Sequence, residues 1–191
     1  MSGIRIIAGE LRGRVLPFAN RDFDNADITP QKVKGALFSM IGEWLHGRGF
    51  LDLYAGSGQI GIEALSRGAD PVVINEKDPK RFRFIKTWLS NINYASPPHL
   101  LNFTDLKALD YLNQSRISVR YVFLDPPYEK TKEGIARYRD VVMAIGERGI
   151  LDDGGQIVIQ HFHRAVLDET VGPFRLRTTK KYGRTSLSVY E

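Results

Sequence analysis

The sequence predicts an α/β fold in which a mostly parallel sheet is covered by helices on both faces. From residue 50 onward, short apolar strands alternate with amphipathic helices, a pattern typical of strand–helix–strand units. A glycine-rich turn follows the first of these strands. Residues 173–190 form two β-prone runs joined by a Tyr-Gly turn, with no helix between them. This last feature predicts an antiparallel hairpin at the C-terminal end of the sheet.

The N-terminal stretch predicts a small extension made of a hairpin and a helix. Residues 4–8 and 14–18 are short β-prone runs on either side of a glycine-containing turn. Residues 19–29 are polar and predict a loop. Thr29 is a candidate N-cap, and Pro30 suits the first position of the helix that follows.

The core elements are expected in regular order within a single domain. A chain of 191 residues fits one globular domain, which we divide into an N-terminal extension of residues 1–48 and a core of residues 49–191. A short helix is expected between the third and fourth core strands. The core strands are predicted at 50–55, 71–76, 99–104, 120–125 and 154–162, and the longer helices at 59–68, 79–92 and 137–148.

Composition excludes several classes of protein. The chain has no cysteine, which rules out disulfides, cysteine-ligated metals and cysteine nucleophiles, and fits a cytoplasmic location. We find no signal-peptide pattern and no apolar run near the roughly 20 residues of a membrane span. The net charge of +5 favours a polyanionic partner such as a nucleic acid.

The turn after the first core strand is a candidate binding loop. It reads Gly56-x-Gly58-x-x-Gly61, whose glycines let the backbone approach a ligand at a helix N-terminus. The same pattern matches the dinucleotide fingerprint. Asp52, still on the strand, would repel a pyrophosphate but attract an amino group or a sulfonium. The loop therefore favours S-adenosylmethionine over a nicotinamide dinucleotide.

Two further acids are expected at the same edge of the sheet. Glu76 ends the second core strand and can accept from ribose hydroxyls, while Asp105 follows the third strand and can accept from the adenine amino group. Asp105 could equally be a helix N-cap. Their neighbours Tyr54, Lys77 and Leu106 complete the predicted cofactor site.

A second motif, Asp125-Pro126-Pro127-Tyr128, follows the fourth core strand. Consecutive prolines stiffen the loop and leave their carbonyls as free acceptors. A carboxylate and carbonyls can hold both N–H bonds of an amino group, and the tyrosine ring can stack on a base. We expect Asp125, Pro126 and Tyr128 to orient an exocyclic amino group towards a methyl donor.

With these motifs, the chain resembles the bacterial small-subunit rRNA guanine-N2 methyltransferases of the RsmD type. The resemblance runs almost from end to end. It is carried by RIIAGELRGRVLP (5–17), LDLYAGSGQIGIEALSRGA (51–69), FLDPPY (123–128) and KKYGRTSLSVYE (180–191). The two central segments are shared by many amino-methyltransferases, and the two outer segments indicate this family.

The resemblance implies a Rossmann-like methyltransferase fold with S-adenosylmethionine as donor and a guanine in a hairpin loop of 16S rRNA as acceptor. Asp27 stands where the family usually has an arginine, and Arg184 where an acid is common. By motif, Asp52, Gly56, Gly58, Glu76 and Asp105 would hold the cofactor, and Asp125, Pro126 and Tyr128 the target guanine.

Basic residues near both ends of the chain are candidate RNA contacts. Contacts to phosphates would make binding sensitive to salt. The acceptor would be 16S rRNA or a small-subunit assembly particle, and a monomer suffices. His161 and His163 alternate on a strand without a third ligand nearby, so no metal is expected. The candidate RNA contacts are Arg12, Arg14, Lys32, Lys181 and Arg184.

Other functions remain compatible with parts of the sequence. A DNA adenine-N6 or protein glutamine methyltransferase would share the Asp-Pro-Pro-Tyr chemistry. A nicotinamide-dependent dehydrogenase would use the glycine loop but leaves Asp52 and the second motif unexplained. A non-catalytic RNA-binding protein would account for the charge alone.

Overall fold

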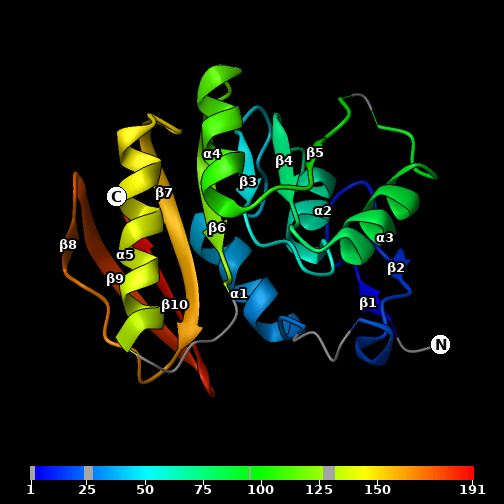
Figure 1. The fold of residues 1–191 in the computed structure, drawn as a ribbon. Coiled ribbons are helices and arrows are strands. Elements are labelled where there is room, and N and C mark those ends of the chain that lie inside the picture. Colours follow the sequence, from blue (N-terminus) through cyan, green and yellow to red (C-terminus); the bar gives the residue numbers. More distant parts are fainter. Residues whose placement is uncertain (1–2, 24–27, 95, 127–131) are drawn as a thin grey trace.

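The structure is a computed structural model that describes residues 3–23, 28–94, 96–126 and 132–191. It contains one eight-stranded sheet, a separate two-stranded sheet and the helices that pack on them (Figure 1). In chain order the elements are β1 (Ile4–Arg5), β2 (Val15–Leu16), the 3-10 helix η1 (Asn20–Asp22), α1 (Gln31–Ile41), β3 (Phe50–Asp52), α2 (Gln59–Ser66), β4 (Val72–Asn75), α3 (Pro79–Leu89), β5 (His99–Leu101), α4 (Asp105–Gln114), β6 (Val119–Leu124), α5 (Lys132–Glu147), β7 (Leu151–Phe162), β8 (Thr170–Val171), β9 (Phe174–Tyr182) and β10 (Thr185–Tyr190).

The large sheet has the strand order β5-β4-β3-β6-β7-β10-β9-β8. Strands β5, β4, β3, β6 and β7 are parallel, whereas β10 is antiparallel to both β7 and β9. The order reverses at β3, whose neighbours are β4 and β6, and such a switch point opens a crevice at the carboxyl ends of the strands. The predicted mostly parallel sheet with an antiparallel C-terminal hairpin is confirmed.

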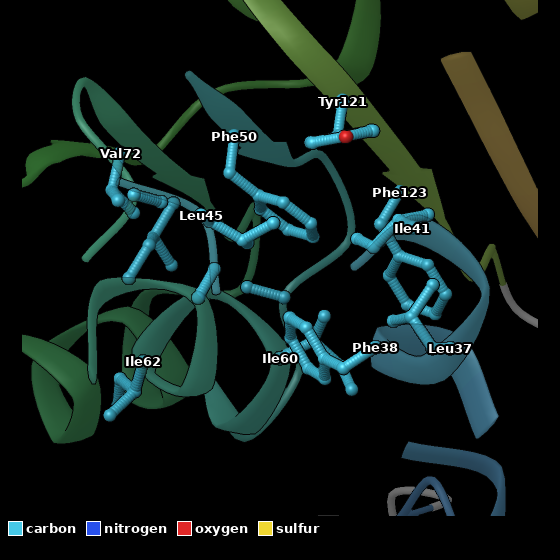
Figure 2. Packing of buried hydrophobic residues seen from close by; sticks show 14 of the residues in the cluster. Leu37, Phe38, Ile41, Leu45, Phe50, Ile60, Ile62, Val72, Tyr121 and Phe123 are labelled. Carbon is cyan, nitrogen blue, oxygen red and sulfur yellow. The ribbon is translucent and has the colours of Figure 1, made fainter. Parts of the chain in front are cut away.

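Helices cover both faces of this sheet. Figure 1 shows α4 and α5 lying over one face, where their apolar residues share a core cluster with Leu51, Val122 and Ile157. Helices α1, α2 and α3 contribute to the cluster on the other face. There Phe38 of α1 stacks near Phe50 of β3, with ring centroids 6.1 Å apart (Figure 2). The sheet is thus packed between two layers of apolar side chains.

The N-terminal extension packs into the same core as the sheet. Ile6 and Leu16 are fully buried in the cluster that contains Phe38 and Phe50. The turn between β1 and β2 docks on the C-terminal end of α2, because Glu10 N–H donates to the Ser66 carbonyl at 2.8 Å. This docking leaves only two residues in each strand of the hairpin, fewer than the sequence predicts.

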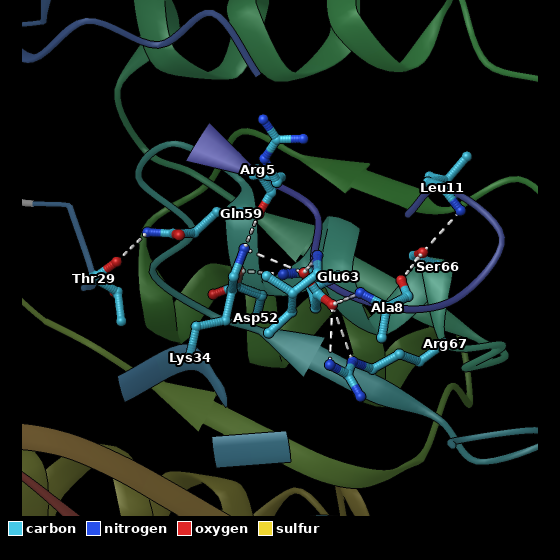
Figure 3. Close-up of polar contacts among 12 residues, drawn as sticks. Arg5, Ala8, Leu11, Thr29, Lys34, Asp52, Gln59, Glu63, Ser66 and Arg67 are labelled. Carbon is cyan, nitrogen blue, oxygen red and sulfur yellow. Dashed lines mark hydrogen bonds and ion pairs between the residues drawn. The ribbon is translucent and has the colours of Figure 1, made fainter. Parts of the chain in front are cut away.

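A buried ion cluster fastens the extension to α2 (Figure 3). The Glu63 carboxylate accepts from the backbone N–H groups of Ile7 and Ala8 at 3.0 and 2.9 Å. It also pairs with Lys34 of α1 at 3.2 Å and with Arg67 at 3.1 Å. Extension and core are therefore joined by polar contacts as well as by apolar packing.

Two local predictions were wrong. Thr29 does not cap α1: the N-cap is Pro30, which makes no side-chain cap hydrogen bond, and the Thr29 hydroxyl turns to Asp125 instead. Helix α5 begins at Lys132 rather than at 137, because Gly134 and the charged residues around it hide the apolar spacing. Across the described ranges, no helix has both the length and the apolar character needed to cross a membrane.

Candidate active site

A cavity of about 480 Å³ opens at the carboxyl ends of β3, β4 and β6. It lies at the switch in strand order, where ligands of α/β sheets bind. Of the residues predicted to hold a cofactor or an amino group, Gly58 and Leu106 do not line it. Those that do are Asp52, Tyr54, Gly56, Glu76, Lys77, Asp105, Asp125 and Pro126.

The glycine loop brings the start of α2 against this cavity. Gly58 is the N-cap of α2 and adopts a left-handed conformation (φ 78°), which a residue with a side chain rarely takes. A Cβ on Gly61 would come within 2.6 Å of the Ile74 side chain, so only glycine lets α2 lie this close to β4. The second and third glycines therefore have distinct structural tasks.

Asp52 is a buried acid of the site with one oxygen left unpartnered in the described part of the chain. Its side chain is 1% exposed, and one oxygen, Oδ2, accepts from the Gly61 N–H at 2.8 Å. The other oxygen, Oδ1, is buried and has no hydrogen-bond partner among the described residues. Burial is the main cause that raises the pKa of Asp52 to about 8; the Gly61 hydrogen bond acts in the opposite direction, and the nearby Asp125 and Glu76 charges add to the rise. A cationic ligand group would satisfy this carboxylate.

Glu76 is held in place by backbone donors on both oxygens. Its Oε2 accepts from Gly56 N–H at 2.6 Å and its Oε1 from Asp78 N–H at 2.8 Å. Burial raises its pKa despite these bonds. Each carboxylate oxygen can accept more than one hydrogen bond, so the held side chain can still receive ribose hydroxyls.

At the far end of the cavity, Asp105 has partners that the sequence did not indicate. Its Oδ2 accepts from the Tyr54 hydroxyl at 2.7 Å and from Arg137 of α5 at 2.6 Å. Burial acts to raise the pKa of Asp105, but these donors outweigh burial and lower it. The N-cap of α4 is Thr104, so Asp105 is the first helical residue and not the cap.

Asp125 and Pro126 follow β6, the neighbour of β3, and line the same cavity as the glycine loop. The Oδ2 atom of Asp125 accepts from the Thr29 hydroxyl at 3.1 Å and from the Gln160 amide at 2.8 Å. The Asp125 charge also contributes to the raised pKa of Asp52, so the two carboxylates interact. The predicted role of Tyr128 falls outside the described residues, as does the Asp27 departure.

The predicted RNA contacts are all exposed but lie in different places. Lys32 is at the start of α1, near the cavity, and Arg184 lies in the β9–β10 turn, beside His163 at the carboxyl end of β7. Lys181 precedes this turn. Arg12 and Arg14 belong to the turn docked on the far end of α2, away from the cavity. Lys32, Lys181 and Arg184 thus lie towards the edge of the sheet at which the cavity opens. Arg12 and Arg14 do not.

The histidines of β7 have structural partners. His161 is 2% exposed and its Nε2 lies 2.8 Å from the Ser188 hydroxyl, while His163 Nδ1 lies 3.2 Å from the Arg184 carbonyl. Within the described part of the chain, no group of three or more histidine, aspartate or glutamate side chains is arranged to bind a metal.

Sequence reasoning missed the residues that reach the site from distant segments. Thr29, Arg137 and Gln160 each donate to a predicted acid of another segment. Arg81 of α3 also lines the cavity. None belongs to a recognisable motif, and only its place at the end of the apolar run Ile157–Ile159 could have marked Gln160 as a buried polar residue.

The donor set of the cavity fits S-adenosylmethionine. The orphaned Asp52 oxygen suits the amino group or the sulfonium of its methionine part, and the fixed Glu76 carboxylate suits its ribose hydroxyls. A dinucleotide would place a pyrophosphate at the glycine loop next to Asp52, and charge repulsion opposes that arrangement.

Comparisons with known proteins agree with this chemistry. Residues 4–191 match the family model "Conserved hypothetical protein 95". "Putative rRNA methyltransferase YlbH" of Bacillus subtilis (strain 168) is 32% identical over 188 residues, which are 98% of this chain and 98% of that protein. "Ribosomal RNA small subunit methyltransferase D" of Escherichia coli (strain K12) is 27% identical over 188 residues, which are 98% of this chain and 89% of that protein.

A solved structure supports the fold. The 16S rRNA N2 G1207 methyltransferase of Thermus thermophilus, in complex with AdoMet and guanosine, matches with a TM-score of 0.69 at 19% identity. The match covers 100% of this chain and 49% of that one. This likeness supports the fold, and the family model and the Bacillus relative show the family. The chain belongs to the "Conserved hypothetical protein 95" family, that of the RsmD-type methyltransferases, and has the Rossmann-like fold of S-adenosylmethionine-dependent methyltransferases.

Proposed function

We propose that this chain transfers a methyl group from S-adenosylmethionine to the exocyclic N2 amino group of a guanine in 16S rRNA. One observation carries the proposal: an unsatisfied buried acid, Asp52, and a hydrogen-bonded acid followed by a proline, Asp125-Pro126, line one cavity. The first suits a cationic donor and the second an amino group. The names of the Bacillus and Escherichia relatives support rRNA as the acceptor.

In this proposal the protein acts mainly by positioning. S-adenosylmethionine, when bound, supplies an electrophilic methyl group on a sulfonium. The Asp125 carboxylate and the Pro126 carbonyl accept from the guanine amino group and direct its nitrogen towards that methyl. Tyr128 stacks on the base, which is splayed out of its loop. As the N–C bond forms and the S–C bond breaks, the amine proton passes to Asp125 or to water.

Asp52, Glu76 and Asp105 hold the donor, assisted by Tyr54, Gly56, Gly58, Lys77 and Leu106. The exposed cations towards the edge of the sheet at which the cavity opens, Lys32, Lys181 and Arg184, contact phosphates near the target, and Arg12 and Arg14 contact a more distant part of the RNA. We propose that the chain works as a monomer on 16S rRNA or on a small-subunit assembly particle.

The decisive variant is Asp125→Ala, with the exposed Asp140→Ala on α5 as control. Asp125→Ala should bind S-adenosylmethionine normally by calorimetry but transfer methyl to 16S rRNA about a hundred- to a thousandfold more slowly. The control should match the wild type. Near-normal transfer by Asp125→Ala would defeat the proposed role.

The acceptor is tested separately by mapping N2-methylguanine in 16S rRNA from cells with and without this protein. Loss of one such nucleotide in the deletion supports the proposal and identifies the target. In vitro, naked 16S rRNA and assembly particles are compared as substrates. Methylation of adenine in DNA or of a glutamine side chain instead would overturn the guanine assignment.

A further inference from the structure

Two residues outside every motif converge on one oxygen of Asp125. The Thr29 hydroxyl, just before α1, and the Gln160 amide, near the end of β7, donate to Oδ2 at 3.1 and 2.8 Å. Thr29 lies 96 positions and Gln160 35 positions from Asp125 in sequence. Such a pair of donors fixes the plane of the carboxylate as well as its position.

The surroundings of Asp125 explain why donors are needed there. Asp52 faces the same cavity, and the charge of each carboxylate disfavours the charge of the other. Hydrogen bonds to an ionised carboxylate favour its charged form. The donors from Thr29 and Gln160 therefore oppose the repulsion and keep Asp125 able to accept from an amino group.

Both donors are themselves held in place. Thr29 is 8% exposed, and its carbonyl accepts from the Gln59 amide at 3.1 Å (Figure 3). The ring of Pro30 fixes the backbone φ of the residue that follows Thr29. Gln160 is 2% exposed and sits opposite Leu187 in the β7–β10 ladder. Both side chains are already fixed before substrate binds, so the Asp125 carboxylate that they hold is preorganised.

We infer that Thr29 and Gln160 are positioning residues that hold the Asp125 carboxylate aimed at the amino group of the acceptor. The inference rests on the proposed function, since it assigns Asp125 the acceptor role. It gives the N-terminal extension a part in the chemistry besides RNA contact.

The test compares Thr29→Val and Gln160→Leu, which keep shape but remove the donor, with the conservative Thr29→Ser. Gln156→Leu is the control on the same strand, where the amide contacts Glu191 at the surface. The measurements are kcat and KM for methyl transfer to 16S rRNA, the Kd for S-adenosylmethionine, and the melting temperature.

Each donor-free variant should lower kcat about tenfold to a hundredfold, the effect of one hydrogen bond to a charged group, with little change in KM or in cofactor Kd. Thr29→Ser should restore most of kcat, and Gln156→Leu should behave as wild type. The losses of the two single variants should not multiply in the double variant Thr29→Val/Gln160→Leu, because both donors share one oxygen.

Three results would overturn the inference: unchanged kcat in both donor-free variants, a loss confined to RNA KM, or equal losses in Thr29→Ser and Thr29→Val. The inference would also be contradicted if kcat fell in proportion to the melting temperature and Gln156→Leu lowered kcat by the same factor. If the wild-type protein itself transfers no methyl to guanine, the proposed function fails first, and this outcome is distinguishable from the others.

Discussion

Helix α2 touches two buried carboxylates whose surroundings are opposite. Glu63, on the helix, is 0% exposed and accepts from two backbone N–H groups while pairing with Lys34 and Arg67 (Figure 3). Asp52, which receives the Gly61 N–H at the start of the same helix, is 1% exposed and keeps one oxygen without a partner among the described residues. One acid is saturated and the other is not.

The difference separates a structural acid from a binding acid. A buried charge is costly unless it is paired and hydrogen-bonded, so Glu63 and its partners stabilise the native state only as a complete set. Asp52 lacks such a set in the ligand-free protein, and its raised pKa records the cost. When a ligand with a positive group binds, it pairs with this carboxylate and relieves the penalty of its burial, which favours binding. Four predictions test this contrast, in order of decreasing effect.

The largest effect is expected for Glu63→Gln. The amide keeps the shape but leaves Lys34 and Arg67 buried without a counter-charge, so the free energy of unfolding should fall by about 3–5 kcal/mol. Urea denaturation measures this change, and the exposed Glu10→Gln serves as control. A loss no larger than that of the control would show that the cluster is not the anchor of the extension.

For Asp52→Asn we expect a loss of cofactor affinity without a loss of stability. Cofactor affinity should fall roughly a hundredfold, which corresponds to about 2.7 kcal/mol, because the counter-charge of the ligand is gone. The ligand-free variant should be at least as stable as the wild type at pH 8, because the unsatisfied charge is removed. Calorimetry and thermal unfolding measure the two effects, and a variant destabilised like Glu63→Gln would contradict the assignment.

The pH dependence of stability gives a smaller effect with a definite sign. The folded-state pKa of Asp52 is about 8, above the unfolded value near 3.9. Between these values the folded state retains a proton that the unfolded state has released, so stability falls as pH rises and levels off above about 8. From pH 6 to pH 8 the wild type should lose about 2.3 kcal/mol relative to Asp52→Asn. If the difference in unfolding free energy between the wild type and Asp52→Asn stayed constant with pH, a raised pKa of Asp52 would be contradicted.

The smallest effect is expected for Arg137→Ala. This guanidinium pairs with Asp105 but its side chain is 51% exposed, so the ion pair should contribute less than about 1 kcal/mol to stability. Its removal leaves Oδ2 of Asp105 with the Tyr54 hydroxyl alone, so this oxygen can accept from the cofactor and the affinity should rise roughly two- to fivefold. The gain should shrink in high salt, where the ion pair is already screened. A loss of affinity would instead assign Arg137 to holding the cofactor.

The sequence predicted the elements and acids that depend on local pattern. The alternation of strands and helices, the glycine loop and the three acids at strand ends were all readable, because periodicity and turn chemistry are properties of short windows. Errors arose where local and tertiary preferences differ. Thr29 is a residue type that often caps helices, yet its hydroxyl donates to Asp125 because that partly buried carboxylate is the stronger acceptor.

By itself, then, the sequence determined the order of the elements, the kind of sheet and the placement of Asp52, Glu76 and Asp125 at its carboxyl edge. Tertiary structure alone decided which acids have partners. Glu63 is satisfied by segments on both sides of it in sequence, Asp52 is left open, and Asp125 is held by Thr29 and Gln160. The physical reason is that a buried charge is satisfied or left open by whatever the rest of the chain brings to it, and no short window of sequence contains those partners.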